Sequence, residues 1–521
     1  MTVPLVLIAA IWLFVSTAVF AVPPQKHATP ADELVHEAQL LWQHDKKGSI
    51  EKVKQALKID PARWDIQIEL ASMYLQLGER ANALAVVEAA VKADPKPYAL
   101  SRFLNAAIRA GNTDHFAVLV EAGAQVGKDN DEFLLYVISQ RQTPTVGMVA
   151  LLLRKGARVN QSVRYNTALM HAASEDHFDI AKLLLANGAE VNAKTEDGTA
   201  LMKAVRRGNP EMVKLLIEHG ADLNAKHRSG NTPLIMSADP SFVEMNAKAG
   251  DPQPVQASEI MRLLLAKGAN PNDVGQYGRT ALMQASSAAK VQLLLARGAQ
   301  VNAKDDEGAT ALTRAVDRGD VAIAEALLKA DADGLNAQNR DGETLLMSAV
   351  RAGRTDLAKL LLAQGADPNL VDVLGDTVLV LAYEKGLSEI EALSRSVDPA
   401  KITPAEQNAW LRAAIAKKDE LKVKELLETG ADANYKYAIG YRHPTVKRTV
   451  LIDAVKVGHL GIVQLLLARG ADPSVEGLLH GSEHGLKYGT ALDAAESSKN
   501  AEILALLRNA VAQRILNRKS G

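Results

Sequence analysis

The sequence predicts an all-α fold, a solenoid of stacked helical repeats. Three observations support this prediction: related phrases return about every 33 or 34 residues, leucine-rich runs between them have helical spacing, and a glycine follows most of these runs. A repeat of this length cannot bury its apolar face alone, so neighbouring repeats have to stack. Apolar residues make up 47% of the chain and aromatic residues only 4%, which favours many small helices in close contact.

The chain begins with an apolar segment that has the features of a targeting sequence. Residues 3–22 carry no charge, and Val19 and Ala21 stand at the third and first positions before a cleavage site. We therefore expect residues 1–21 to be a signal peptide or, since the segment is nearly long enough to span a bilayer, an uncleaved anchor. Residues 22–30 would follow as a linker, and the rest of the chain would lie outside the cytoplasm.

Residues 31–98 carry a repeat of about 34 residues. The sequence KIDP at Lys58–Pro61 returns as KADP at Lys92–Pro95. These prolines should end helices, because proline cannot continue the hydrogen-bond ladder. Ala83 and Ala90 are small enough to let two paired helices approach closely. The segment resembles tetratricopeptide repeats, with one good copy and a degraded copy before it, which implies helix pairs.

From residue 99 to residue 518 the period is about 33 residues, and most units open with a threonine and close with a glycine. The threonine precedes Ala-Leu-Met or a variant of it at Thr167, Thr199, Thr232, Thr280, Thr310, Thr344, Thr377, Thr449 and Thr490. Glycine followed by alanine returns at Gly123, Gly156, Gly188, Gly220, Gly268, Gly298, Gly365, Gly430 and Gly470. We expect the threonine to cap a short first helix, the leucine-rich second helix to pack against it, and the glycine to end that second helix in a left-handed conformation.

These phrases resemble the ankyrin repeat. The family phrase T-P-L-H-x-A survives best at Thr232-Pro233-Leu234. Elsewhere alanine commonly replaces the proline, and methionine replaces the histidine at Met170, Met202, Met283 and Met347. About twelve units can be distinguished, and Asp331 and Asp398 replace the turn glycine in two of them. The resemblance covers about four fifths of the chain and implies a protein-binding array that is not an enzyme and needs no cofactor.

Three insertions interrupt the array. Well-formed units use 11 or 12 residues between the turn glycine and the next threonine, whereas two neighbouring units near the C-terminus use 19 and 20. We call the extra segments the first finger, residues 435–448, and the second finger, residues 474–488. Because neighbouring repeats carry the fingers, they should lie side by side. The third insertion, residues 238–257, is expected to form a flexible flap on a different side.

The two fingers are rich in tyrosine and cationic residues, and they hold four of the ten tyrosines of the chain. Tyrosine and arginine are enriched at protein interfaces because they provide much contact area at low entropic cost. We therefore expect the fingers to bind a protein partner; the alternative is that both are long solvated loops whose tyrosines pack on each other. The expected binding residues are Tyr435, Tyr437, Tyr441, Arg442, His443, Lys447, Arg448, His480, Glu483, His484 and Tyr488.

The second finger also contains the H-x-x-E-H spacing of one class of zinc hydrolases, at His480, Glu483 and His484. That chemistry needs both histidines on one helical turn, and three glycines that flank and interrupt the stretch oppose a helix. We therefore predict no metal site and no catalytic residue. The sequence contains no glycine-rich phosphate loop and no G-x-S-x-G elbow, and the lack of cysteine excludes disulfides and thiol nucleophiles.

The charge balance and the resemblance together predict a function. Lys plus Arg number 60 against 61 Asp plus Glu, a net charge of −1, so no global field favours nucleic acid. The resemblance implies a monomeric scaffold that binds another protein in the periplasm of a Gram-negative bacterium, with membrane contact only if the N-terminal segment is retained. The alternative is an inhibitor or immunity protein that neutralises a secreted toxic enzyme such as a lipase. A zinc hydrolase is the third hypothesis.

Overall fold

The computed structural model describes residues 29–93, 97–123, 130–139, 145–163, 166–239, 241, 253–331, 333–397, 404–438, 447–482 and 485–519. The apolar N-terminal segment, much of the insertion at residues 238–257 and part of each finger lie outside these residues. The chain divides into two compact units, Met1–Gln276 and Tyr277–Gly521. Among the described residues, we find no helix with the length and apolar character that a membrane span requires.

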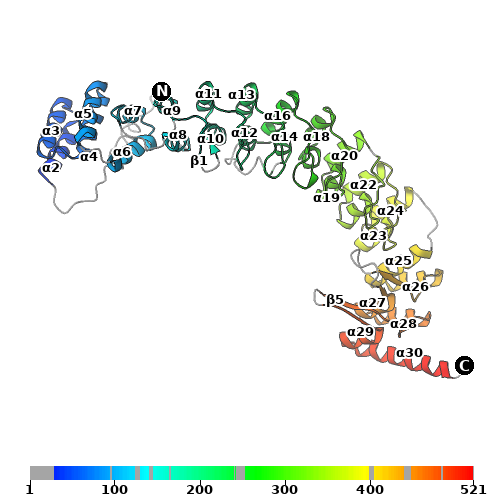
Figure 1. The fold of residues 1–521 in the computed structure, drawn as a ribbon. Helices are drawn as coiled ribbons and strands as arrows, with labels where there is room; N and C mark the ends of the chain where they lie inside the picture. The colour runs from blue at the N-terminus through cyan, green and yellow to red at the C-terminus, as the bar shows by residue number, and fades with distance from the viewer. Residues whose placement is uncertain are drawn as a thin grey trace. The chain divides into compact units, whose positions relative to one another are not determined.

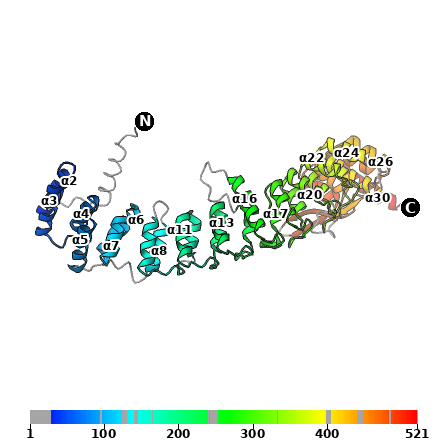
Figure 2. The same ribbon diagram turned by 90° about the horizontal axis from the view of Figure 1, so that it is seen from above.

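The N-terminal unit begins with four helices that form two packed pairs, α2 with α3 and α4 with α5 (Figure 2). Their bounds are α2 (Pro30–Leu41), α3 (Lys46–Ile59), α4 (Trp64–Gln76) and α5 (Arg80–Ala93). Trp42, Val53 and Ile66 lie in a shared core, and the indole N–H of Trp42 donates to Oε1 of Gln76 at 2.9 Å. Ala83 on α5 is fully buried, which agrees with a close approach of the paired helices.

The rest of the N-terminal unit consists of further helix pairs in two rows (Figure 1). First helices α8, α10, α12 and α14 pack against one another in one row, and second helices α9, α11, α13 and α16 lie in the other. The bounds are α6 (Pro97–Arg109), α7 (Thr113–Glu121), α8 (Asn130–Ser139), α9 (Val146–Arg154), β1 (Ser162–Val163), β2 (Asn166–Thr167), α10 (Ala168–Glu175), α11 (Phe178–Ala186), α12 (Ala200–Arg207), α13 (Pro210–Glu218), α14 (Pro233–Ala238) and α16 (Gln253–Ala266).

The C-terminal unit repeats the same two-row arrangement. Each first helix packs on the next along α17, α19, α21, α23, α25, α27 and α29, while most second helices pack on their successors along the other row. The bounds are η1 (Gln276–Gly278), α17 (Ala281–Gln284), α18 (Ala288–Leu295), α19 (Ala311–Arg318), α20 (Val321–Ala330), α21 (Leu345–Arg351), α22 (Thr355–Ala363), α23 (Val378–Lys385), α24 (Ser388–Val397), α25 (Pro404–Ala416), α26 (Glu420–Thr429), α27 (Val450–Val457), α28 (Leu460–Ala468), α29 (Ala491–Ser498) and α30 (Ala501–Lys519).

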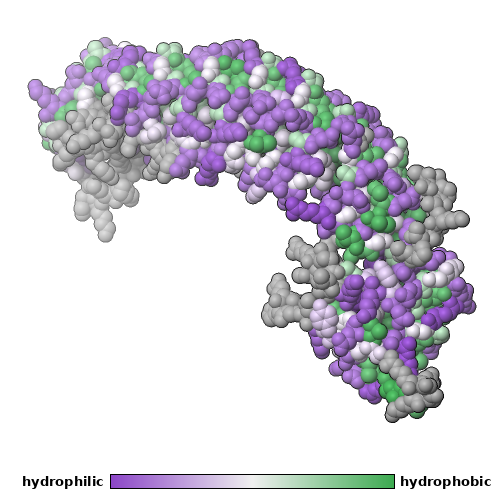
Figure 3. Space-filling model, turned by 45° about the vertical axis from the view of Figure 1, so that its right-hand side comes forward, coloured by the Kyte–Doolittle hydropathy of each residue, from purple (hydrophilic) through white to green (hydrophobic). Residues whose placement is uncertain are grey.

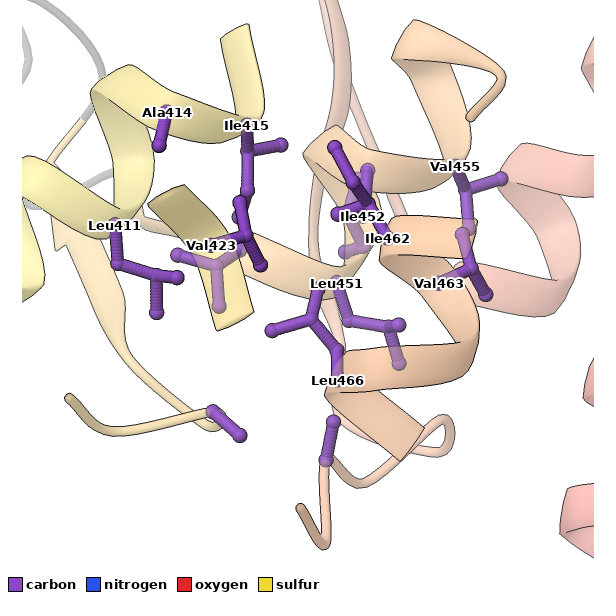
Figure 4. Close-up of a cluster of buried hydrophobic side chains, with 14 of the residues drawn as sticks. Leu411, Ala414, Ile415, Val423, Leu451, Ile452, Val455, Ile462, Val463 and Leu466 are labelled. Carbon is purple, nitrogen blue, oxygen red and sulfur yellow. The ribbon is translucent and has the colours of Figure 1, made fainter. Parts of the chain in front are cut away.

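The core lies between the two rows, where apolar side chains of successive helix pairs meet. Figure 4 shows Leu411 and Ile415 of α25, Leu451 and Val455 of α27 and Leu466 of α28 pointing into one cluster. Each of these five residues has at most 1% of its surface exposed to solvent. Burying one such side chain contributes about 1.5–3 kcal/mol, so most of the stability of a repeat comes from its contacts with its neighbours.

Recurring threonines and glycines begin and end the helices as the sequence predicts. The hydroxyl of Thr199 accepts the N–H of Met202, and all nine recurring threonines cap a first helix in the same way. Each cap is worth about 1 kcal/mol. All nine recurring glycines have φ between 81° and 115°, a conformation that a side chain disfavours. The prediction of an all-α solenoid of stacked helical repeats is confirmed.

Asp331, one of the two residues that replace the turn glycine, changes the local geometry. Its φ is −162°, so α20 ends in an extended residue and not in a left-handed turn. Asp176 adopts the left-handed conformation at the end of α10, so the aspartate side chain alone does not explain the extended conformation of Asp331. Asp398, the second such residue, lies outside the described residues.

Each finger contains a β-hairpin, which was not predicted from the sequence. In the first finger β3 (Lys436–Ala438) pairs with β4 (Lys447–Thr449), and Tyr437 stands opposite Arg448. In the second finger β5 (Gly477–Ser482) pairs with β6 (Gly485–Gly489), with an irregularity between Leu478 and His480. Both pairs are antiparallel and two-stranded.

Candidate protein-binding site

The two finger hairpins lie against each other through β4 and β5. Gly477 at the start of β5 is so close to β4 that a Cβ added to it would stand 3.1 Å from the Cα of Arg448. Thr449, the last residue of β4, caps α27, and Thr490, the residue after β6, caps α29. The first helices of successive repeats therefore fix the end of each hairpin and bring the two hairpins side by side.

Cationic side chains hold the main chain of the second finger. The Nε–H of Arg448 on β4 donates to the carbonyl of Leu478 at 2.8 Å. Lys456 on α27 donates through Nζ to the neighbouring carbonyl of Leu479, also at 2.8 Å. These bonds satisfy two carbonyls of β5 and connect the second finger to the first finger and to α27.

Asp453 on α27 holds both strands of the first finger. Its Oδ2 accepts a hydrogen bond from the hydroxyl of Tyr437 on β3, and its Oδ1 lies 3.0 Å from Nη1 of Arg448 on β4. The ring of Tyr437 stacks on the ring of Tyr435 at a centroid distance of 6.0 Å. The guanidinium of Arg412 lies 5.3 Å from the centroid of the Tyr437 ring. The first finger is therefore fastened to α27 and α25 by polar and cation–π contacts.

Burial dominates the electrostatics of the ion pair between Asp453 and Arg448. The side chains are only 18% and 15% exposed. Burial raises the pKa of Asp453 to about 7, although Lys456 and Arg412 lower it, and burial lowers the pKa of Arg448. Removing two charges from water costs more than their attraction returns in such a site, so this pair fixes geometry more than it adds stability.

The predicted binding residues whose side chains the structure describes divide into a half-buried and an exposed group. Tyr435 and Tyr437 are half-buried and pack on the core of the C-terminal unit, so replacing them by alanine would also remove packing. Arg448 is half-buried as well. Lys447 is exposed, and Tyr488 has half of its surface in solvent. Only these last two are free to meet a partner among the described side chains of the prediction.

The remaining predicted residues are not all described. Tyr441, Arg442, His443, Glu483 and His484 lie outside the described residues. His480 lies on β5 opposite Lys487, so residues 477–482 form a strand and not the helical turn that an H-x-x-E-H zinc site uses. Within the described part of the chain, no cluster of three or more His, Asp or Glu residues is arranged to hold a metal ion.

Three residues that position the fingers were not predicted from the sequence, namely Asp453, Lys456 and Arg412. Asp453 and Lys456 are the fourth and seventh residues after the capping Thr449, and a spacing of three places them on one face of α27. An aspartate directly after the apolar Val-Leu-Ile of this repeat was the available signal, because a charge so close to the core needs a partner. Arg412 lies on α25, the first helix of the preceding repeat, and no spacing in the sequence predicts its contact with Tyr437.

The surface of the protein is mostly hydrophilic on the face shown in Figure 3, with hydrophobic residues in separate patches. Tyr488 and Tyr277 are the two tyrosines among the large apolar side chains that are well exposed in the described part of the chain. Among the described residues of the two fingers, Tyr488 is therefore the well-exposed aromatic side chain, and aromatic residues are enriched at protein interfaces.

Family models for ankyrin repeats match more than half of the chain. A model of three copies matches residues 103–195, 255–336, 288–372 and 332–401, a model of many copies matches residues 195–237, and a single-repeat model matches residues 447–477. The chain belongs to the ankyrin-repeat family. Ankyrin repeats mediate protein–protein interactions, which supports a protein partner. The helices α2–α5 lie outside the matched residues, so their resemblance to tetratricopeptide repeats stays a prediction.

One curated relative is similar to part of this ankyrin-repeat protein. It is the E3 ubiquitin-protein ligase KEG of Arabidopsis thaliana, 28% identical over 159 residues. The match covers 28% of this chain and 9% of the relative, so the chain spans less than a tenth of that protein. A similarity of this extent agrees with shared repeats and does not establish an activity.

Proposed function

We propose that this ankyrin-repeat protein is a non-enzymatic scaffold that binds a partner protein through its two fingers. The observation that supports the proposal is the bond from Arg448 to the Leu478 carbonyl, which joins two neighbouring hairpins into one surface. Groups that are already ordered lose little conformational entropy when a partner docks. Lys447 and Tyr488 present an exposed cation and an exposed aromatic side chain on that surface.

We further propose that the protein acts in the periplasm. The support is the uncharged apolar segment at residues 3–22, with Val19 and Ala21 before its expected cleavage site. Fusion of residues 1–30 to a reporter enzyme that is active only after export would test this. A fusion that remains inactive, beside an active fusion with an established signal peptide, would contradict a periplasmic location.

The finger proposal is tested by capture of partners with the full chain. The variant Lys447→Ala/Tyr488→Ala removes two exposed side chains, so it should fold normally while its affinity for the captured partner falls at least about tenfold. The matched control is Lys304→Ala/Tyr277→Ala, which removes an exposed lysine and a tyrosine that is 60% exposed, away from the fingers.

The exported fraction of the source cells supplies the candidate partners, and mass spectrometry identifies those that wild type and control retain. Equal capture by the finger variant and by wild type would refute the finger proposal. A single partner at one copy per chain would favour the inhibitor hypothesis, and several partners would favour the scaffold.

A further inference from the structure

Where the first helix after a capping threonine has seven or more residues, the fourth and seventh residues after that threonine lie one turn apart on one face of the helix. In the C-terminal unit, two arginines at these positions have carboxylate partners. Arg314 is the fourth residue after Thr310, and its Nη2 lies 2.6 Å from Oδ2 of Asp305. Arg351 is the seventh residue after Thr344, and its Nε lies 3.3 Å from Oε1 of Glu343. These pairs neutralise the face within the protein.

The same positions of α12 in the N-terminal unit carry two cations that have fewer carboxylate partners than these arginines. Lys203 and Arg206 follow Thr199 by four and seven residues, so they lie one turn apart on one face. The side chain of Lys203 is 11% exposed, and its Nζ lies 3.5 Å from Oδ2 of Asp197. Arg206 is half-buried, and within the described part of the chain its side chain forms no hydrogen bond or ion pair.

The two cations destabilise each other because both are partly removed from water. Burial is the main cause that lowers the pKa of Lys203, and the charge of Arg206 lowers it further, whereas Asp197 raises it. Arg206 is half-buried and has no acceptor among the described residues, and none of its side-chain nitrogens is buried without a partner, so its guanidinium is accessible from solvent. An anion from outside would satisfy its guanidinium.

His227, in the turn before α14, adds a hydrogen-bond donor to this cluster. Its Nδ1 accepts the N–H of Ser229 at 3.2 Å, so the proton of the neutral ring resides on Nε2. Burial lowers the pKa of His227, and so do the charges of Arg228, Arg206 and Lys203, while Asp197 raises it. The ring is therefore neutral at neutral pH and offers Nε2–H as a donor.

The cluster is local, compact and positive. Lys203, Arg206 and Arg228 outnumber Asp197, the carboxylate that acts on both Lys203 and His227. The whole chain has a net charge of only −1, so no extended field attracts a polyanion such as nucleic acid. A guanidinium, an ammonium and an imidazole N–H within two neighbouring repeats match the carboxylates of one or two acidic side chains.

We propose that Lys203, Arg206 and His227 form a binding site for an acidic peptide segment of a partner protein. The site lies in the N-terminal unit and is separate from the fingers, so it goes beyond the proposed finger function. A guanidinium binds a carboxylate through two parallel N–H donors, and the neutral imidazole donates through Nε2. The incoming charge replaces the internal carboxylate that Arg206 lacks.

The proposal is tested by fluorescence anisotropy of the full chain with labelled peptides. The probe is a peptide of alternating aspartate and serine, and the neutral control replaces aspartate by asparagine. Arg206→Gln should weaken binding of the acidic peptide about tenfold, the loss expected for one charge-assisted contact. Arg262→Gln, an exposed arginine of α16, removes the same charge elsewhere in the same unit and should leave the affinity unchanged.

A second readout locates the peptide. The pKa of His227, followed by NMR, should rise when the acidic peptide saturates the protein, because carboxylates nearby favour the charged ring. Three results would each overturn the proposal: equal weakening by Arg206→Gln and Arg262→Gln, tighter binding of an oligothymidylate than of the acidic peptide, or an unchanged pKa of His227 at saturation. The finger variant Lys447→Ala/Tyr488→Ala should bind the acidic peptide as wild type does, which separates failure of this proposal from failure of the finger proposal.

Discussion

The guanidinium of Arg448 in the first finger donates a hydrogen bond to the carbonyl of Leu478 in the second, at 2.8 Å. The same guanidinium lies 3.0 Å from Asp453, which also accepts from Tyr437. One side chain thus connects two hairpins of neighbouring repeats to a helix beneath them. The surface proposed for partner binding depends on this connection, because two-stranded hairpins are marginal on their own.

Replacing Arg448 by methionine should loosen the second finger while the repeats remain folded. The change leaves the Leu478 carbonyl without this donor and Asp453 without its ion-pair partner, so we expect a loss of about 2 kcal/mol in the free energy of unfolding. Hydrogen exchange should accelerate at the amides of β5 and β6. Lys436→Gln removes an exposed charge from the same finger and serves as the control; unchanged exchange in the Arg448 variant would contradict the role assigned to this residue.

The carboxyl of Asp453 should make stability depend on pH. Burial raises its pKa from 3.8 to about 7, so the native state holds this proton more tightly than the unfolded chain does. The resulting stabilisation is fully present below about pH 4 and is lost as the pH rises through about 7. Between these two pH values the free energy of unfolding of the wild type should fall by a few kcal/mol. An asparagine side chain cannot titrate, so the variant Asp453→Asn should not show this fall. Denaturant unfolding across this range measures it, and parallel profiles for the two proteins would disprove the shift.

Tyr383 should lower the pKa of Asp419. The Tyr383 hydroxyl donates to Oδ2 of Asp419 at 2.6 Å and is the largest cause of the lowered pKa, followed by the N–H of Lys422. Tyr383→Phe should raise this pKa towards 3.8 and cost about 1 kcal/mol. Because the pKa is lowered in the native state, the stabilisation is present above about pH 4 and disappears as the pH falls through the native pKa.

The pKa of Asp419 is measured by NMR of the side-chain carboxyl. The exposed Tyr488 supplies the control Tyr488→Phe, which removes a hydroxyl from the second finger. An equal pKa of Asp419 in wild type and in Tyr383→Phe would show that the hydroxyl does not act on this carboxylate.

Gly477 should tolerate no side chain, because it lies against the first finger. A Cβ there would stand 3.0 Å from Cδ1 of Ile452 and 3.3 Å from the main-chain N of Thr449. Gly477→Ala should therefore cost about 1–2 kcal/mol through displacement of the two hairpins. Gly334→Ala is the control, since its nearest atom would be Oδ1 of Asn302 at 3.8 Å. Equal thermal stability of the two variants would show that the hairpins can separate without cost.

The sequence predicts the repeats well because their signals are local. Thr199 before Ala-Leu-Met and the glycine at Gly188 act within a few residues, and each needs only its own backbone geometry to explain its position. At Asp331, where the turn glycine is absent, the sequence predicts no particular turn, and the structure has an extended residue there. The turn glycine predicts a left-handed turn after the second helix. Where that glycine is absent, neighbouring residues alone do not predict which conformation replaces the turn.

The candidate site is harder to predict because its contacts join distant residues. The composition of the fingers indicated binding, but it did not distinguish Tyr437, held by Asp453, from the exposed Tyr488. Which tyrosine packs against the core depends on α27 and α25, and no spacing within the finger carries that information. The contact between Arg448 and Leu478 spans two repeats, so only the stacked structure reveals it.

In repeats whose first helix has seven or more residues, the helix face formed by the fourth and seventh residues after the capping threonine has an evolutionary consequence. The threonine, the buried leucines and the terminal glycine satisfy the demands of folding, whereas Lys203, Arg314 and Asp453 occupy equivalent positions with opposite or dissimilar chemistry. A mutation there can therefore change what one repeat recognises without altering its neighbours. Ligand preference can diversify repeat by repeat while the architecture is inherited unchanged.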